Sequence, residues 1–337
     1  MKTPLTYRVL SLVVLALFIA SKGESDTPGC ETFSAWSDPV NLGNFVNSSA
    51  FDSAATLSPN ELSLYFVSTR PGGQGMQDIW VSQRRCADAE VCPWETPQNL
   101  KGRDPDTGIV IEINSPSPDG GPSLSTDGHL LFFHSFRTGG YGGFDIWVSY
   151  RSNPNDDFGW GPPVNLGSDV NTSASETSPD YLQSADFYAE AMAGVPANAA
   201  ALYFSRGPDV NHQDIYVAPV TRDGSALGPA VPVNELNSLN PAFNEAAPSV
   251  RTDGKEILFW SSRLGGLGSG DIWASTRSTI HEAWSTPQNV GIPVNTTSND
   301  VRPNLSRSGR TLLFDSNRPG GQGDQDIWMS TREPGCR

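Results

Sequence analysis

The sequence predicts an all-β fold: a five-bladed β-propeller with four-stranded antiparallel blades, closed by the N-terminal strand pairing into the last blade. The main observation is that Asp-Ile-Trp or Asp-Ile-Tyr recurs five times, with an apolar triplet and an Asn-x4-acid pattern before each copy. Glycine and proline are abundant, as expected of short strands joined by tight turns. No segment has a convincing 3.6-residue apolar periodicity. The five copies begin at Asp78, Asp145, Asp214, Asp271 and Asp326.

The N-terminal residues 1–23 are expected to be a signal peptide. Lys2 and Arg8 precede an apolar run over 9–20, and small residues follow up to Gly23. A basic start, a short apolar stretch and small residues at the cleavage site are typical of exported proteins. We therefore divide the chain into a signal peptide, 1–23, and one propeller domain, 24–337, without a membrane span.

The charge balance is strongly acidic, with a formal net charge of −15. Such a surface repels nucleic acid and anionic lipid, so neither is an expected partner. The expected location is the periplasm, the outer envelope or the extracellular space, and the expected state is a monomer. The expected ligand is a protein or a glycan, with no cofactor.

Each repeat is expected to form four strands, which we name D, A, B and C in chain order. Strand A follows the repeated acid, B holds the apolar triplet, and C begins at Asp-Ile-Trp. The Asp-Gly turns at 125–128 and 251–254 mark A–B hairpins, and the Pro-Gly-Gly turns at 71–73 and 319–321 mark B–C turns. In a propeller, D–A and B–C loops open on one face and A–B and C–D loops on the other. The D strands lie around Val40, Leu100, Val164, Val231 and Val290.

The chain begins with a D strand and ends with a C strand, so closure should pair the first D strand with the last C strand. Cys30 lies just before that D strand and Cys336 just after that C strand, which predicts a Cys30–Cys336 disulfide. Cys86 and Cys92 occupy the C–D connection of blade 1 and predict a local disulfide. Paired cysteines suit an exported chain better than thiols or metal ligands do.

The repeat resembles a known family, the WD40-like PD40 repeat of TolB-type propellers. Residues 119–128 (Asp-Gly-Gly-Pro-Ser-Leu-Ser-Thr-Asp-Gly) and 317–328 (Asn-Arg-Pro-Gly-Gly-Gln-Gly-Asp-Gln-Asp-Ile-Trp) carry the resemblance best. It spans essentially the whole mature chain and implies a propeller used as a binding scaffold in a bacterial envelope. TolB has a further α/β domain and six blades, so its partners are not carried over.

Five acids stand where the innermost strands begin, around the expected mouth of the central channel. They could bind a cation or a sugar, but pairing with the arginine after each B strand is the favoured interpretation. The repeat asparagines are Asn47, Asn114, Asn171, Asn240 and Asn295. The acids are Asp52, Asp119, Glu176, Glu245 and Asp300. The arginines are Arg70, Arg137, Arg206, Arg263 and Arg318.

Function often lies where a repeat breaks its pattern. The residue before the B-strand serine varies most and offers His134, Trp260 and Asp315, beside Val67, as ligand-binding candidates, although neutral drift explains the variation equally well. Blade 3 lacks the Gly-Gly turn and carries an insertion at 181–201. The longer D–A loop of blade 2 has a weak calcium-binding character, from Asp104, Asp106 and Glu112.

Two functions remain open at this point. Five near-equivalent blades without a catalytic constellation favour a non-enzymatic scaffold that binds a protein or glycan on the D–A/B–C face. The alternative is a carbohydrate-active enzyme, a glycoside hydrolase or polysaccharide lyase, with Asp52, Glu176, Glu245 and Asp300 as candidate catalytic acids. The histidines lack ligand spacing and no serine nucleophile motif is present, so zinc and serine hydrolase chemistry are not expected.

Overall fold

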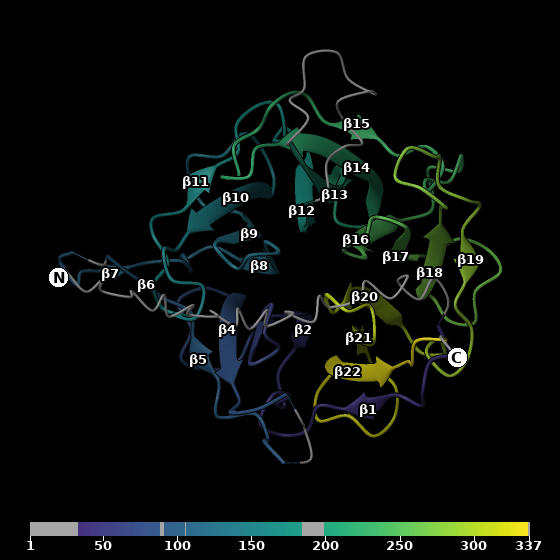
Figure 1. Cartoon of the computed structure of the whole chain (residues 1–337), viewed down its shortest axis with the longest axis horizontal. Coiled ribbons are helices and arrows are strands. Elements are labelled where there is room, and N and C mark those ends of the chain that lie inside the picture. Colours follow the sequence, from purple (N-terminus) through teal and green to yellow (C-terminus); the bar gives the residue numbers. More distant parts are fainter. Residues whose placement is uncertain (1–32, 88–90, 105, 184–198, 336–337) are drawn as a thin grey trace, which may run out of the picture.

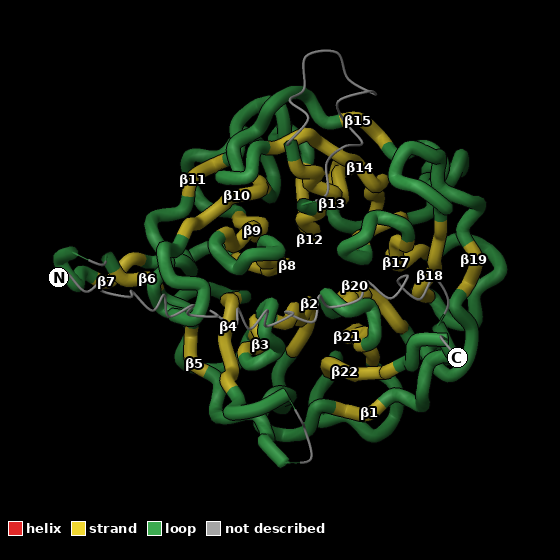
Figure 2. The backbone as a smooth tube through the Cα atoms, viewed as in Figure 1, coloured by secondary structure: helices red, strands yellow, loops and turns green. Residues whose placement is uncertain are grey.

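The computed structural model describes residues 33–87, 91–104, 106–183 and 199–335. Within these ranges the chain is all β, and five four-stranded antiparallel sheets stand around a common axis (Figure 1). Strands and loops, without helix, make up the described backbone (Figure 2). The predicted five-bladed propeller is therefore confirmed. Within the same ranges, no helix is long and apolar enough to cross a bilayer.

The strands of each blade run from the axis outward in the order A, B, C, D. Blade 1 contains β2 (Asp52–Leu57), β3 (Ser63–Ser68), β4 (Asp78–Gln83) and β5 (Gln98–Asn99). Blade 2 contains β8 (Asp119–Leu124), β9 (Leu130–Ser135), β10 (Asp145–Tyr150) and β11 (Val164–Asn165). Blade 3 contains β12 (Ser175–Leu182), β13 (Ala200–Asp209), β14 (His212–Val220) and β15 (Val231–Pro232). Blade 4 contains β16 (Glu245–Val250), β17 (Glu256–Ser261), β18 (Asp271–Thr276) and β19 (Gln288–Asn289).

Blade 5 is completed by the N-terminal part of the chain. Its strands are β20 (Asp300–Leu305), β21 (Thr311–Ser316), β22 (Asp326–Thr331) and β1 (Val40–Asn41). In the antiparallel register Val40 pairs with Met329 and Asn41 with Trp328, which confirms the predicted closure. An additional hairpin, β6 (Gly102–Arg103) and β7 (Val110–Ile111), projects from the D–A loop of blade 2.

Of the two predicted disulfides, one can be compared with the structure. Cys86 and Cys92 are bonded, with 5.5 Å between their Cα atoms, as predicted. Cys30, Cys336 and the signal peptide 1–23 lie outside the described residues, as does most of the 181–201 insertion. A disulfide is typical of a protein exported to an oxidising compartment.

Each blade packs its apolar face against the next blade, so the core is a ring of interfaces. Leu130 and Phe132 of blade 2, for example, lie in one buried cluster with Leu202 and Phe204 of blade 3. Between the blades, an asparagine clamps the previous C strand. Asn114 donates to the Ile79 carbonyl and accepts from the Ile79 N–H, both at 2.8 Å.

Two of the sequence-based repeat alignments are wrong by a few residues. In blade 4 the clamping asparagine is Asn237, which contacts Ile215, and not Asn240, because the loop before the acid is three residues longer. In blade 3 the residue opposite the acid Glu176 is Arg206, whereas in blade 1 the residue opposite the acid Asp52 is Ser68. Ser205 therefore takes the variable position, because the B strand has one residue fewer before its arginine.

Candidate functional site

The five repeat acids lie at the start of the innermost strands, and each forms an ion pair with the arginine of its own blade. All five carboxylates are buried, with at most 1% of each side chain exposed. The N–O distances are 2.7 Å for Arg70–Asp52, Arg137–Asp119 and Arg318–Asp300, 2.8 Å for Arg206–Glu176, and 3.1 Å for Arg263–Glu245.

Blade 2 shows how the remaining hydrogen-bonding capacity of these groups is used. Asp119 Oδ2 accepts from the N–H and hydroxyl of Ser115, at 2.6 and 2.8 Å, which shapes the D–A turn. Arg137 lies over the rings of Phe133 and Trp147, at 5.1 and 5.2 Å from their centroids. Both members of the pair are thus engaged within their own blade, which is the geometry of a scaffold interaction.

The Asp-Ile-Trp aspartates play a local part in the B–C turns. Asp78 Oδ2 accepts from the N–H of Gln74 at 2.6 Å, and Asp145 accepts from the N–H of Tyr141 at 2.8 Å. Burial raises the pKa of both carboxyls. These aspartates therefore organise turns on the D–A/B–C face.

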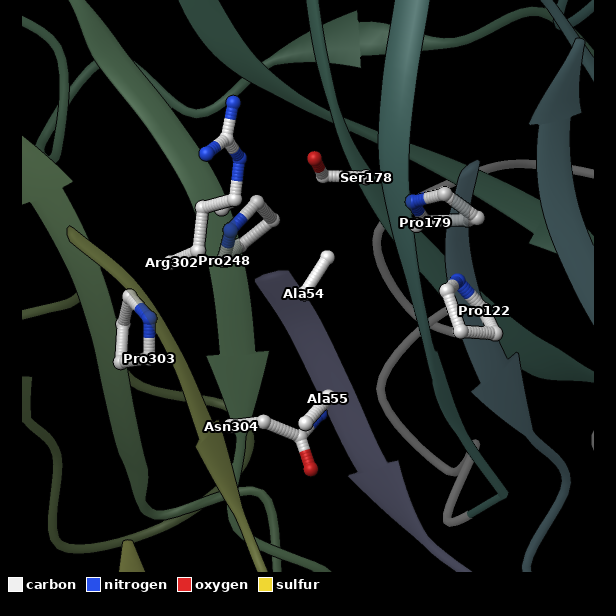
Figure 3. Close-up of a pocket in the computed structure, with 11 residues that line it drawn as sticks. Ala54, Ala55, Pro122, Ser178, Pro179, Pro248, Arg302, Pro303 and Asn304 are labelled. Carbon is white, nitrogen blue, oxygen red and sulfur yellow. The ribbon is translucent and has the colours of Figure 1, made fainter. Parts of the chain in front are cut away.

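A small cavity lies on the propeller axis, lined from the second residue after each acid onward. Its volume is about 30 Å³, which is room for one water molecule. Arg302 and Ser178 lie at one end and Asn304 at the other (Figure 3). In every blade the second residue after the acid has a positive φ, because the inner strand forms a bulge there. The five such residues are Ala54, Gly121, Ser178, Ala247 and Arg302.

The variable B-strand side chains reach from one blade to the bulge of the next. His134 Nδ1 accepts from the Ser178 N–H at 3.1 Å, and Ser205 Oγ accepts from the Ala247 N–H at 2.9 Å. Asp315 closes the ring, because its two oxygens accept from the Ala54 N–H at 3.0 and 3.1 Å. The position that varies most in the sequence therefore sets the contacts around the axis.

Blade 5 has a charged pair at this point. Arg302 Nη1 lies 3.4 Å from Asp315 Oδ2, and 37% of the Arg302 side chain is exposed against 1% for Asp315. The pKa of Asp315 is raised to about 7, mainly by burial and to a smaller extent by the charge of Asp52, while Arg302 and the Ala54 N–H oppose the shift. Asp315 is thus a carboxyl that holds its proton near neutral pH.

The other variable side chains have different properties. Burial and the nearby Arg302 lower the pKa of His134 to about 3, so the imidazole is neutral at ordinary pH. Trp260 is partly exposed and pairs in register with Ala246 of the inner strand, while Val67 is buried. His134, Arg302 and Asp315 are therefore linked electrostatically, although they come from blades 2 and 5.

A second carboxyl of raised pKa lies further along the axis. Asp180 Oδ2 accepts from the Val250 N–H of the next inner strand at 2.7 Å. Burial raises its pKa to about 7, although hydrogen bonds oppose the shift. Asp180 thus resembles Asp315 in burial and in its backbone contact but, among the described residues, it forms no ion pair with an arginine.

The loop with calcium-binding character uses its oxygens internally. Asp104 Oδ1 accepts from the N–H groups of Asp106 and Thr107 and from the Thr107 hydroxyl, at 2.7 to 3.1 Å. The Thr107 hydrogen bonds lower the pKa of Asp104. Glu112 accepts from Gln74 instead of facing these residues. Across the described ranges, no group of three His, Cys, Asp or Glu side chains is placed to hold a metal.

Sequence reasoning missed two sets of residues. Arg302 was detectable from the sequence, because it is charged, whereas the second residue after the acid is Ala, Gly or Ser in the other blades. The second set is a group of arginines, each directly after a C strand, whose guanidinium groups lie 4.0 to 4.4 Å from tryptophan ring centroids on the A–B/C–D face. The pairs are Arg84–Trp94, Arg151–Trp160, Arg277–Trp284 and Arg332–Trp36.

Comparisons with known proteins give structural matches. No protein-family model and no curated protein sequence matches the chain. An α-L-arabinofuranosidase from Lactobacillus brevis is 12% identical, with 87% of this chain and 92% of that chain covered and a TM-score of 0.52. A thermostable family-43 glycoside hydrolase is 12% identical over 86% and 91%, with a TM-score of 0.53. A protein of unknown function from Dyadobacter fermentans is 11% identical over 89% and 98%, with a TM-score of 0.51.

At this identity the matches establish the propeller fold that these proteins share. The two named enzymes among these three matches are glycoside hydrolases, and neither is described as a PD40-repeat protein. The expectation of a non-enzymatic scaffold that binds a protein or glycan on the D–A/B–C face is corrected here, because the named enzymes that share this propeller are glycoside hydrolases. Near-equivalent blades were a poor argument against catalysis, because they reflect the scaffold and say little of the few residues that differ.

Proposed function

We propose that this chain is an exported glycoside hydrolase whose reacting groups lie at the axial cavity, with Asp315 as the general acid. The observation that carries the proposal is that Arg302, which lines that cavity, pairs with the buried Asp315 behind it, in the one blade that has charged residues at both positions. The glycoside hydrolases among the similar propellers support the substrate class.

Asp315 has the property that a general acid needs. A glycosidic oxygen must receive a proton as its bond to the anomeric carbon breaks, so the acid must still be protonated near the working pH. Burial, which raises the pKa of Asp315 to about 7, supplies that condition. The ring acids have a different environment, because each lies 2.7 to 3.1 Å from its arginine, whereas Asp315 lies 3.4 Å from Arg302.

The second carboxylate of the reaction is proposed to be Asp52. Its charge raises the pKa of Asp315, so the two carboxyls are electrostatic neighbours, and Arg70 holds it at 2.7 Å. Pairs of carboxyls in contrasting environments divide acid and base roles in many glycosidases. In this proposal Asp315 donates to the leaving oxygen, and Asp52 takes the proton of the water that adds to the anomeric carbon.

The cavity limits how a substrate is bound. A volume of about 30 Å³ admits a water molecule or a single hydroxyl group, so the sugar ring itself would lie across the opening. Arg302 would then move away from Asp315, as its 37% exposure permits. Trp260 and His134 are proposed to contact the sugar beside it. We also propose that the protein acts in the periplasm, at the outer envelope or outside the cell, and that its repeats are related to PD40 repeats.

The test compares two carboxyl-to-amide variants, Asp315→Asn and Asp180→Asn. Both carboxyls are buried, accept a backbone N–H and have a raised pKa, so the second variant is a matched control. Reducing-end release from arabinan, xylan and β-1,3-galactan should fall by at least 100-fold in Asp315→Asn, because general acid catalysis contributes roughly 10²-fold or more. Asp180→Asn should retain the rate.

Single amide substitutions at the five ring acids complete the test. A large loss at Asp52 together with smaller losses elsewhere would support the assignment. Equal, small losses at all five positions would show that the ring only supports the fold. Release of unsaturated sugars in place of hydrolysis products would identify a lyase and refute the hydrolytic step.

A further inference from the structure

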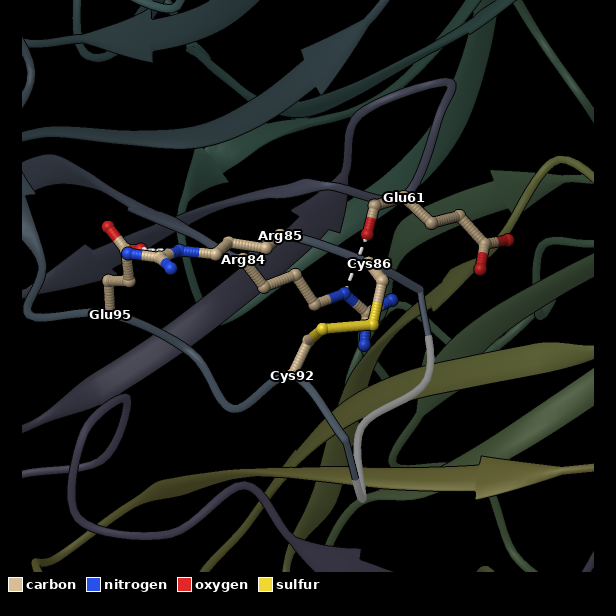
Figure 4. Close-up of a disulfide and its surroundings, with 6 residues drawn as sticks. All are labelled: Glu61, Arg84, Arg85, Cys86, Cys92 and Glu95. Carbon is tan, nitrogen blue, oxygen red and sulfur yellow. Dashed lines mark hydrogen bonds and ion pairs between the residues drawn. A yellow bond between two sulfur atoms is a disulfide. The ribbon is translucent and has the colours of Figure 1, made fainter.

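Away from the axis, two neighbouring hollows share lining residues of the blade 1 C–D connection. The Cys86–Cys92 disulfide closes this connection (Figure 4). The first has a volume of about 480 Å³ and is lined by Phe45, Trp94 and Thr96, among others. The second has a volume of about 430 Å³ and is lined by Asn60, Gln83 and Asn155, among others. Both volumes are in the range of small-molecule sites, roughly 300 to 1,000 Å³.

The two hollows form one groove, because Arg85 and Glu95 line both of them. These two side chains pair with each other at 3.6 Å and are exposed, so they form a low divider that faces solvent. Figure 4 shows the pair beside the disulfide, with Arg84 directed at the Glu61 carbonyl. We call this surface the rim groove.

The chemistry of the rim groove changes along its length. At one end Phe45 is 53% exposed, so an aromatic ring faces solvent. At the other end the lining is amide-rich, and Asn60 Nδ2 lies 3.4 Å from Asn155 Oδ1 on the exposed surface. Aromatic rings contact the apolar faces of sugars, and side-chain amides both donate to and accept from hydroxyl groups.

Charge selects the ligand class. Within the rim groove the charges balance, because the lining holds two arginines, Arg84 and Arg85, and two acids, Glu95 and Asp157. The protein as a whole carries −15, which repels acidic polysaccharides. A neutral chain of sugars satisfies both conditions and matches a groove that is aromatic at one end and amide-lined at the other.

We infer that the rim groove is a second glycan-binding site, which holds a neutral oligosaccharide away from the axial cavity. The ligand class rests on the proposed function, but the site does not include any residue of the proposed reaction. The loop is held at its base by the disulfide, and Trp94 is held by Arg84 at 4.4 Å from its ring centroid. The groove is therefore formed before a ligand arrives.

Calorimetric titration of the Asp315→Asn protein with neutral xylohexaose, arabinohexaose and β-1,3-galactohexaose tests the inference without turnover. A second variant adds Phe45→Ala and Asn155→Ala, two exposed positions where truncation should leave the fold intact. The affinity of this variant should fall about tenfold or more, because the loss of a central contact costs about 1.4 kcal/mol or more of binding free energy. The matched control adds Tyr150→Ala, an aromatic residue with 56% exposure outside the groove, and should bind unchanged.

Unchanged affinity in the Phe45→Ala, Asn155→Ala protein would overturn the inference, as would the absence of binding to all three oligosaccharides. Stronger binding of oligogalacturonate than of the neutral chains would overturn the assigned ligand class. Because the readout is binding, the rim groove can fail while the hydrolase proposal stands. Conversely, Asp315→Asn could retain hydrolysis while the rim groove variant loses binding, which would refute only the proposed catalytic residue.

Discussion

Replacing Asp180 by asparagine should change how the stability of the propeller depends on pH. The folded protein holds the Asp180 proton up to about pH 7, whereas the unfolded chain releases it near the ordinary value of 3.8. The folded state therefore binds more protons between these two values. It follows that the contribution of Asp180 to stability is fully present below about pH 4 and is lost as the pH rises to about 7.

The size of this effect follows from the shift. Each pH unit inside the window corresponds to about 1.4 kcal/mol, so a shift of about three units gives up to about 4 kcal/mol. Asparagine does not titrate there, and its Oδ1 can still accept from the Val250 N–H, which Asp180 contacts at 2.7 Å. Above pH 7 the variant should therefore be the more stable protein, and below pH 4 the difference should vanish.

Urea unfolding followed by tryptophan fluorescence, at half-unit steps from pH 4 to pH 8, measures the difference between the two proteins. Burial also raises the pKa of Asp315 to about 7, so the variant should keep part of the slope while losing the contribution of Asp180. Parallel stability curves for the two proteins across the whole range would refute the burial-based explanation. A variant that is less stable at every pH would show that the carboxylate is needed in its charged form.

Two further predictions concern the scaffold. Asp119→Asn should lower the free energy of unfolding by about 3 kcal/mol, because it leaves the partly buried Arg137 without its carboxylate at 2.7 Å, and urea unfolding measures this; a loss below about 1 kcal/mol would contradict it. Cys86→Ser with Cys92→Ser should cost about 2 kcal/mol, since the bond closes a short loop with a sequence separation of 6. In that second case, an unchanged melting temperature would contradict the prediction.

The architecture was accessible from the sequence because its signals are local and repeated. Asp-Ile-Trp copies, glycine turns and the terminal D and C strands predicted the blades, the pairing of Val40 with Met329, and the Cys86–Cys92 bond. Alignment failed where a repeat changes length. A longer loop displaced the clamp of blade 4 to Asn237, and one missing residue placed Ser205 in the variable position of blade 3.

The site was less accessible, because its residues meet only when the ring closes. Asp315 was singled out by its variability, yet its contacts with Ala54 of blade 1 and with Arg302 depend on the arrangement around the axis. The raised pKa values of Asp315 and Asp180 arise from burial between blades, which repeat alignment does not show. The arginine and tryptophan pairs were missed for a simpler reason: three pairs are separated in sequence by a C–D loop, and Arg332 meets Trp36 only when the two ends of the chain close the ring.

The pH profile of reducing-end release from neutral glycans, measured for the unmodified protein and for Asp315→Asn, tests the central claim most directly. The hydrolase account predicts release by the unmodified protein that declines as the pH rises above about 7, where Asp315 loses its proton. It predicts that Asp315→Asn loses this release at every pH. No release from any glycan, or an Asp315→Asn protein with the same rate and the same profile, would contradict the account.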